Sequence, residues 1–99
     1  MLDLDLINEE TLDIKLNKEI INVKEPKYSL VIKTKDFFNS VNKGDPIKKQ
    51  NEILIEFLNN NTNNRKFKEE DIMNMSSKAV TALSKLLIDI IMGTEENPN

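Results

Sequence analysis

The chain has 99 residues, of which 38% are hydrophobic and 31% are charged, and its formal net charge is -3. This length and composition fit one globular domain with a modest core, and exclude a disordered chain or a core with a separate catalytic domain. The absence of cysteine and histidine excludes disulfides, thiolate metal sites and the commonest general base. The net negative charge argues against nucleic acid or an anionic membrane as the partner.

In the first ten residues, MLDLDLINEE, leucine alternates with aspartate, which predicts a strand over residues 2–7 that would widen a following hairpin to three strands. Acids also stand where a secretory signal needs a basic start, and no segment approaches the roughly 18 apolar residues of a membrane span. We therefore expect a cytosolic protein.

A β-hairpin is predicted over residues 11–24 because apolar and polar residues alternate there. The inward apolar positions are Leu12, Ile14, Leu16, Ile21 and Val23. The connection Asn17-Lys18 suits a two-residue type I′ turn, although Lys18 stands where glycine is preferred. Pro26 ends the second strand.

Residues 28–34 fit two structures. Tyr28, Leu30 and Ile32 alternate as in a strand, whereas a helix gathers more apolar residues on one face. Those residues are Leu30, Val31, Thr34, Phe37, Phe38 and Val41. We favour the helix, and the strand stays open as the alternative.

Asp45-Pro46 marks a clear helix start, with a capping carboxylate followed by a proline at the first helical position. The helix extends to Leu58, and Ile55 lies outside its apolar stripe. The stripe consists of Ile47, Ile53, Leu54, Phe57 and Leu58. This helix should be the central partner of the last one.

The asparagine-rich residues 59–64 predict an exposed loop, either a mobile binding loop or, as we favour, a tolerated low-complexity insertion. Phe67 returns to the core, and residues 68–73 form a short acidic helix whose inward residue is Ile72. Its consecutive acids point in different directions, so we expect no metal site there.

The longest amphipathic helix is predicted over residues 76–93, capped by Ser76 and stopped by Gly93. Its inner face gathers Ala79, Val80, Leu83, Leu86, Leu87, Ile90 and Ile91. The polar residues 94–99 should be a disordered tail. The predicted fold is α+β and mostly helical: one domain over residues 1–93, with the hairpin at 11–24 and a bundle of three to four helices over 29–93.

Three stretches, LDIKLNKEIINVKEPKYSL, IKKQNEILIEFLN and KFKEEDIMNMS, occur in this order before the final helix. The order of parts over residues 11–92 resembles the tail assembly chaperones of long-tailed phages and prophages of low-GC bacteria. This resemblance implies a non-catalytic protein of the host bacterial cytoplasm without a cofactor. It would bind the tape measure protein and, in a frameshifted longer form, recruit tail tube protein.

Ile88 and Met92 are the best candidates for partner contact, since they lie one turn apart on the last helix and outside its main arc. Ile55 is a similar case on the preceding long helix. The alternative is that all three simply complete the core. The hairpin edge is another candidate, because it could pair with a neighbouring copy, so that a homo-oligomer is left open.

A small helix-turn-helix regulator of DNA is the alternative function, with residues 66–87 as the motif. Its recognition helix would expose only Lys78 and Lys85, which is a weak basic face. The basic stretch 64–68 reads better as a surface loop than as a phosphate site. An enzyme is disfavoured because no catalytic motif surrounds the acids, lysines, serines or the single tyrosine.

Overall fold

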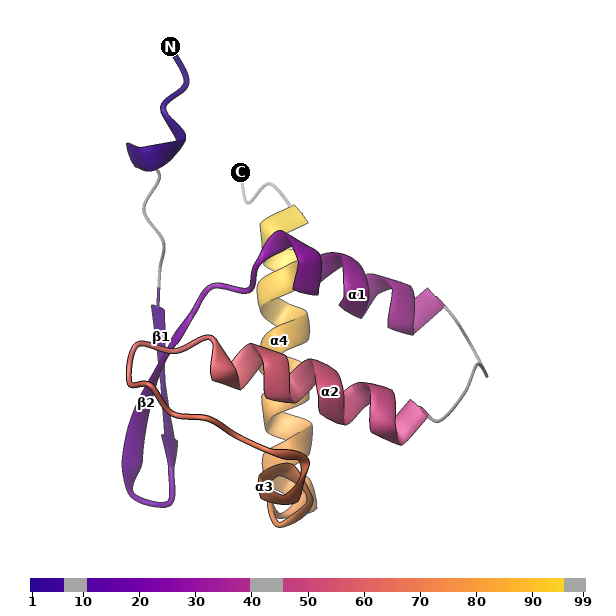
Figure 1. The fold of residues 1–99 in the computed structure, drawn as a ribbon. Coiled ribbons are helices and arrows are strands. Elements are labelled where there is room, and N and C mark those ends of the chain that lie inside the picture. Colours follow the sequence, from indigo (N-terminus) through magenta and orange to yellow (C-terminus); the bar gives the residue numbers. More distant parts are fainter. Residues whose placement is uncertain (7–10, 40–45, 96–99) are drawn as a thin grey trace.

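A computed structural model describes residues 1–6, 11–39 and 46–95. Figure 1 shows an antiparallel hairpin beside a set of α-helices. Helices α1 (Tyr28–Asn39) and α2 (Pro46–Asn59) lie side by side, and α4 (Ser77–Glu95) crosses behind both of them. The short α3 (Glu69–Met73) lies near the start of α4. The prediction of an α+β, mostly helical fold with an N-terminal hairpin is confirmed.

The hairpin pairs β1 (Thr11–Leu16) with β2 (Glu19–Lys24), in a register that places Leu12 opposite Val23. Asn17 and Lys18 have φ angles of 53° and 68°, as a type I′ turn requires at both central residues. This turn matches the right-handed twist of the strands. The predicted hairpin over residues 11–24 and its turn are therefore confirmed.

The predicted third strand at the N-terminus is wrong for the residues that the structure describes. Leu4–Leu6 form a single 3₁₀ turn, and Leu2 and Leu4 are exposed. The side chain of Asp3 accepts a hydrogen bond from the amide of Asp5 at 3.0 Å, which satisfies locally a group that a strand would pair. Ile7, the last residue of the predicted strand, lies outside the described residues.

The helices largely follow the predictions. Residues 28–34 are helical, and α2 begins at Pro46. The hydroxyl of Ser76 accepts a hydrogen bond from the amide of Ala79 at 3.1 Å, so Ser76 caps α4 as expected. Gly93 does not end the helix, which continues to Glu95, because glycine permits a stop but does not impose one. The predicted disordered tail lies, from residue 96 onward, outside the described residues.

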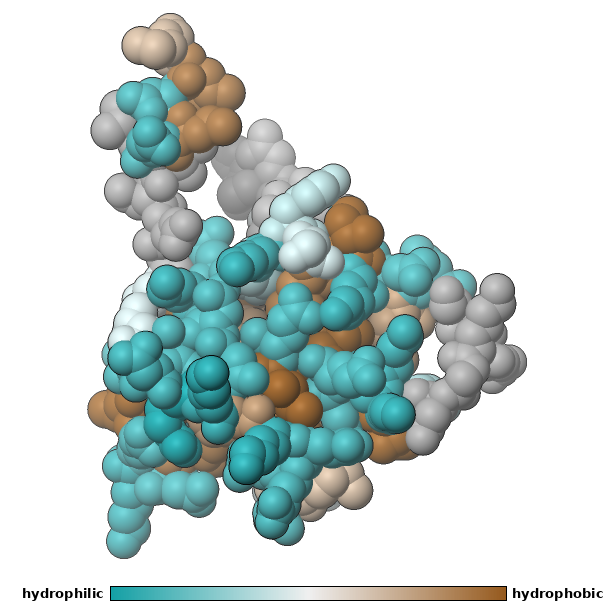
Figure 2. All heavy atoms as spheres, in the orientation of Figure 1, coloured by the Kyte–Doolittle hydropathy of each residue, from teal (hydrophilic) through white to brown (hydrophobic). Residues whose placement is uncertain are grey.

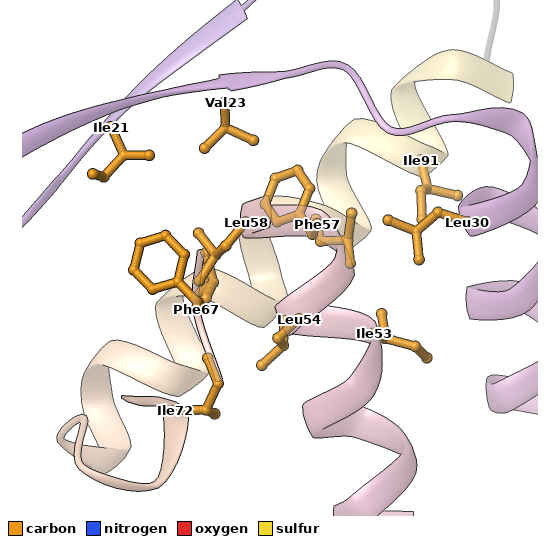
Figure 3. Packing of buried hydrophobic residues seen from close by; sticks show 12 residues of the cluster. Ile21, Val23, Leu30, Ile53, Leu54, Phe57, Leu58, Phe67, Ile72 and Ile91 are labelled. Atoms are coloured by element: carbon orange, nitrogen blue, oxygen red, sulfur yellow. The ribbon is translucent and has the colours of Figure 1, made fainter. Parts of the chain in front are cut away.

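The core surrounds α2, whose inner face meets the hairpin, α1, α3 and α4. Figure 3 shows Ile21 and Val23 of β2 pointing toward Phe57 and Leu58 of α2. Phe57 and Val23 have no exposed surface. The remaining buried hydrophobic residues are Ile21, Leu30, Ile53, Leu54, Leu58, Phe67, Ile72, Leu83, Leu87 and Ile91. The predicted packing of α2 against the last helix and the predicted inward positions of Phe67 and Ile72 are confirmed.

Ile47 on α2 differs from the prediction, because it is 60% exposed although it fits the apolar stripe. Asn51, a polar residue for which no position was predicted, is buried. Both lie on the same helical face, one turn apart, but only the later turns of α2 reach the packed centre of the core. The Nδ2 atom of Asn51 donates a weak hydrogen bond of 3.4 Å to the sulfur of Met73.

The asparagine-rich segment after α2 is largely exposed, as predicted, but it is also hydrogen-bonded to the hairpin. It runs along β2, where the amide of Lys24 donates to the carbonyl of Asn60 at 2.7 Å and the amide of Thr62 donates to the carbonyl of Asn22 at 3.0 Å. An isolated antiparallel bridge joins Val23 to Asn61. The segment therefore acts as a short third partner of the hairpin and covers the outer edge of β2.

Candidate functional site

The candidate site is an apolar pocket of about 160 Å³ where α1, α2 and α4 meet, which we call the helix pocket. No charged side chain is among the residues that line it. The lining residues are Thr34, Phe37, Phe38, Gln50, Ile53, Leu54, Ser84, Leu87 and Ile88. The pocket lies where α1 and α2, which are adjacent and antiparallel, cross α4.

Two hydroxyl groups in the helix pocket differ in their hydrogen bonding. Thr34 donates to the carbonyl of Leu30 at 2.8 Å, so its hydroxyl is satisfied by the preceding turn of α1. The Ser84 oxygen is buried and has no hydrogen-bond partner among the described residues. A buried hydroxyl without a partner is unfavourable, and a polar group brought in by a bound molecule would relieve this cost.

Two adjacent phenylalanines form the α1 side of the helix pocket. The ring centroids of Phe37 and Phe38 lie 5.4 Å apart with the rings tilted, and Phe38 is 53% exposed. Sequence reasoning placed both rings on the buried face and so missed this edge. Adjacent residues of a helix point about 100° apart, so the sequence already indicated that Phe37 and Phe38 could not both be deeply buried.

Of the three predicted partner-contact residues, only Ile88 lines the helix pocket. Met92 follows one turn later on α4 and is 48% exposed. Ile55 lines a different pocket, of about 480 Å³, beside Lys27 and Glu52 at the other side of α2. The structure therefore places Ile88 and Met92 on one surface of α4 and separates Ile55 from them.

Two basic side chains, those of Lys33 and Arg65, form ion pairs within the fold. Lys33 of α1 and Glu56 of α2 form an ion pair at 2.8 Å that links the two helices. The Nε atom of Arg65 lies 3.2 Å from the carboxylate of Glu19, and its guanidinium group lies 4.9 Å from the centre of the Phe67 ring. The arginine of the basic stretch 64–68 thus fastens the loop to the hairpin and the core.

Figure 2 shows that the face viewed in Figure 1 is mostly hydrophilic, with hydrophobic residues appearing in small areas between the helices. Among residues 1–6, 11–39 and 46–95, no group of three or more acidic side chains is arranged to hold a metal ion. Within the same ranges, every helix is too short or too polar to cross a lipid bilayer.

Comparison of the chain with protein-family models, with curated proteins and with solved structures gave no significant match.

Proposed function

We propose that this protein is a non-catalytic tail assembly chaperone of a long-tailed phage or prophage, which binds the tape measure protein in the cytoplasm of the host bacterium and assists assembly of the tail tube. The order of parts, a hairpin ending at Pro26 followed by helices and a last amphipathic helix, supports this proposal. A tape measure protein is a long helical chain that exposes apolar stripes before the tube encloses it, so it needs a cover during assembly.

The helix pocket is the observation that carries the proposal. Its volume of about 160 Å³ is smaller than the roughly 300 Å³ at which small-molecule sites begin, and it suits single apolar side chains projecting from another protein. An amphipathic helix presents such side chains at regular spacing along one face. Phe38 at the edge of the pocket offers an aromatic anchor of the kind that dominates binding energy.

Met92 extends the same apolar surface along α4. Methionine is flexible and polarizable, so it adapts to partners of varied shape. A chaperone that covers successive segments of a long helical protein needs this adaptability, because those segments differ in sequence. The uncharged lining of the pocket is consistent with recognition by shape and apolar contact rather than by ion pairs.

The experiment is a pull-down in which the tagged full chain is co-expressed with the tape measure protein encoded in the same genome. We expect capture of the tape measure protein, and a loss of about tenfold in affinity for Phe38→Ser, in line with removal of one aromatic anchor. Ile20→Ser is the matched control, because Ile20 is 58% exposed on the hairpin and remote from the helix pocket.

Three results would overturn the proposal. The first is repeated failure of a soluble, folded bait to capture the tape measure protein. The second is equal loss of capture by Phe38→Ser and Ile20→Ser, which would remove the helix pocket from the binding surface. The third is salt-dependent binding of duplex DNA that is weakened by Lys78→Ala, which would favour a DNA-binding regulator instead.

A further inference from the structure

The two edges of the hairpin differ in the hydrogen bonding of their outward backbone groups. In a two-residue hairpin, Leu16 and Glu19 exchange both hydrogen bonds, and hydrogen-bonded pairs then alternate along the ladder. The backbone groups of Ile20, Asn22 and Lys24 consequently point away from β1. The asparagine-rich segment after α2 bonds to those of Asn22 and Lys24.

The outer edge of β1 is uncovered by the described part of the chain. By the same alternation, the N–H and C=O groups of Thr11, Asp13 and Lys15 point away from β2. No backbone or side-chain group of residues 1–6, 11–39 or 46–95 forms a hydrogen bond with the outward backbone groups of Asp13 and Lys15. An edge of this kind is a template for a further strand.

An apolar pocket of about 240 Å³ lies beside this edge, between β1 and the first half of α4, and we call it the strand-edge pocket. Its lining is apolar apart from Lys15. The residues that matter here are Ile14 and Leu16 from the strand, and Ala79, Ala82 and Leu86 from the helix. A strand added to β1 would therefore place the side chains of its apolar face over this pocket.

The charges on β1 specify which strand fits. If a second copy of β1 pairs antiparallel with the first so that Asp13 lies opposite Lys15 of the other copy, the two-fold symmetry creates this opposite-charge pair twice. In the same register Ile14 faces its own counterpart, and Leu12 faces Leu16. Moving the register by two residues in either direction places Asp13 opposite Asp13, or Lys15 opposite Lys15, which is unfavourable.

The side chain of Asp13 is already held on the outer face of the hairpin. Its Oδ1 atom accepts a hydrogen bond of 2.6 Å from the Nδ2 atom of Asn22, the residue directly opposite on β2. This contact holds the Oδ1 atom on the side of β2, and the Oδ2 atom forms no hydrogen bond with the described residues. The Oδ2 atom is therefore left to accept a charge-assisted hydrogen bond from the lysine of the other copy.

We propose that two copies of this chain associate through β1, forming a four-stranded antiparallel sheet in the order β2, β1, β1, β2, with Leu12, Ile14 and Leu16 of each copy covering the strand-edge pocket of the other. The apolar faces of the two hairpins then become continuous. The helix pocket is lined by other residues of α4, together with residues of α1 and α2, and shares no lining residue with the strand-edge pocket. A failure of the dimer would therefore leave the proposed chaperone function untouched, and the reverse also holds.

Charge exchange tests the register. We expect sedimentation velocity to show a dimer of the full chain, and Asp13→Lys or Lys15→Asp alone to weaken association by roughly tenfold or more, because each places two like-charge pairs in the interface. Mixing the two variants should restore association, since every facing pair is then again of opposite charge. A chain that stays monomeric at all accessible concentrations, or variants that dimerise like the parent, would overturn the proposal.

Disulfide trapping gives a second readout that does not depend on charge. The chain has no cysteine, so a single introduced cysteine can form a disulfide only with another copy. Ile14→Cys should cross-link under mild oxidation, because a non-hydrogen-bonded antiparallel pair brings Cα atoms to about 4.5 Å. Leu12→Cys is the matched control and should stay reduced, since it faces Leu16. Equal cross-linking of the two variants would contradict the register.

Discussion

The backbone amide of Asn22 donates a hydrogen bond of 2.7 Å to the side-chain oxygen of Asn63, which lies 41 residues further along the chain. The hydroxyl of Thr62 returns a hydrogen bond of 3.1 Å to the side-chain oxygen of Asn22. These contacts fix the segment after α2 against β2, although neither partner is apolar. A polar segment therefore provides tertiary structure here, because its side chains satisfy strand groups that would otherwise face water.

Asn61 organises this segment, and its replacement by alanine should destabilise the protein. Its Nδ2 atom donates to the carbonyls of Leu58 and Arg65 at 2.7 and 3.0 Å, and its Oδ1 atom accepts from the amides of Asn63 and Arg65 at 2.9 and 3.1 Å. Asn61→Ala removes all four bonds, and we expect the free energy of unfolding to fall by about 1 to 3 kcal/mol in urea denaturation.

Asn74→Ala provides the control for this prediction. Asn74 is exposed at the end of α3 with helical backbone angles that alanine adopts easily, and its side chain makes no hydrogen bond within the described residues. The Asn74→Ala change should alter the free energy of unfolding of the protein by less than about 0.5 kcal/mol. Equal effects of Asn61→Ala and Asn74→Ala would show that the asparagine-rich segment contributes no specific stability.

Lys18→Gly should stabilise the hairpin turn. Lys18 has a φ angle of 68°, and this left-handed conformation costs a residue with a Cβ atom roughly 1 to 2 kcal/mol. Glycine avoids this cost, but it loses more conformational entropy on folding, which offsets part of the gain. We expect a net gain of about 0.5 kcal/mol in thermal or urea unfolding. Lys24→Gly, the same change in a strand of ordinary φ, should lower stability instead; a gain at both positions would contradict the turn assignment.

Phe57→Ala should be the most damaging single truncation in the core. Phe57 is fully buried where β2, α1 and α2 meet, and loss of such a ring typically costs about 3 to 5 kcal/mol. Phe38→Ala removes the same ring from a half-exposed position and should cost about 1 kcal/mol or less. Comparable losses in calorimetry would mean that Phe38 belongs to the core rather than to an accessible pocket edge.

Gly93→Ala should stabilise α4. The helix passes through Gly93, and a Cβ atom added there would meet nothing within 4 Å. Alanine is favoured over glycine inside a helix by about 0.5 to 1 kcal/mol. Circular dichroism during thermal unfolding should show a higher midpoint, while the reverse change Ala82→Gly on the exposed side of α4 should lower it. A lower midpoint for Gly93→Ala would indicate that α4 ends before residue 93.

Local signals along the chain are enough to predict several of the elements. Alternating residues and the pair Asn17-Lys18 predicted the hairpin, Pro46 the start of α2, and Ser76 the cap of α4. These signals act between residues a few positions apart, through hydrogen bonds to the nearest turn and through the periodic placement of apolar side chains. The candidate Ile88 was also within reach of this reasoning, because its place outside the main arc of α4 follows from helical geometry alone.

Other features depend on which surface packs against a residue, and these emerge from the folded arrangement alone. Ile47 fits the apolar stripe but is exposed, and the composition of the asparagine-rich segment does not reveal that it forms hydrogen bonds with β2. Likewise, the helix pocket arises from the crossing of three helices, and Ile55 is separated from Ile88 by the side of α2 on which it lies. Such relations join residues far apart in the chain, and a local pattern carries no information about which surface will cover it.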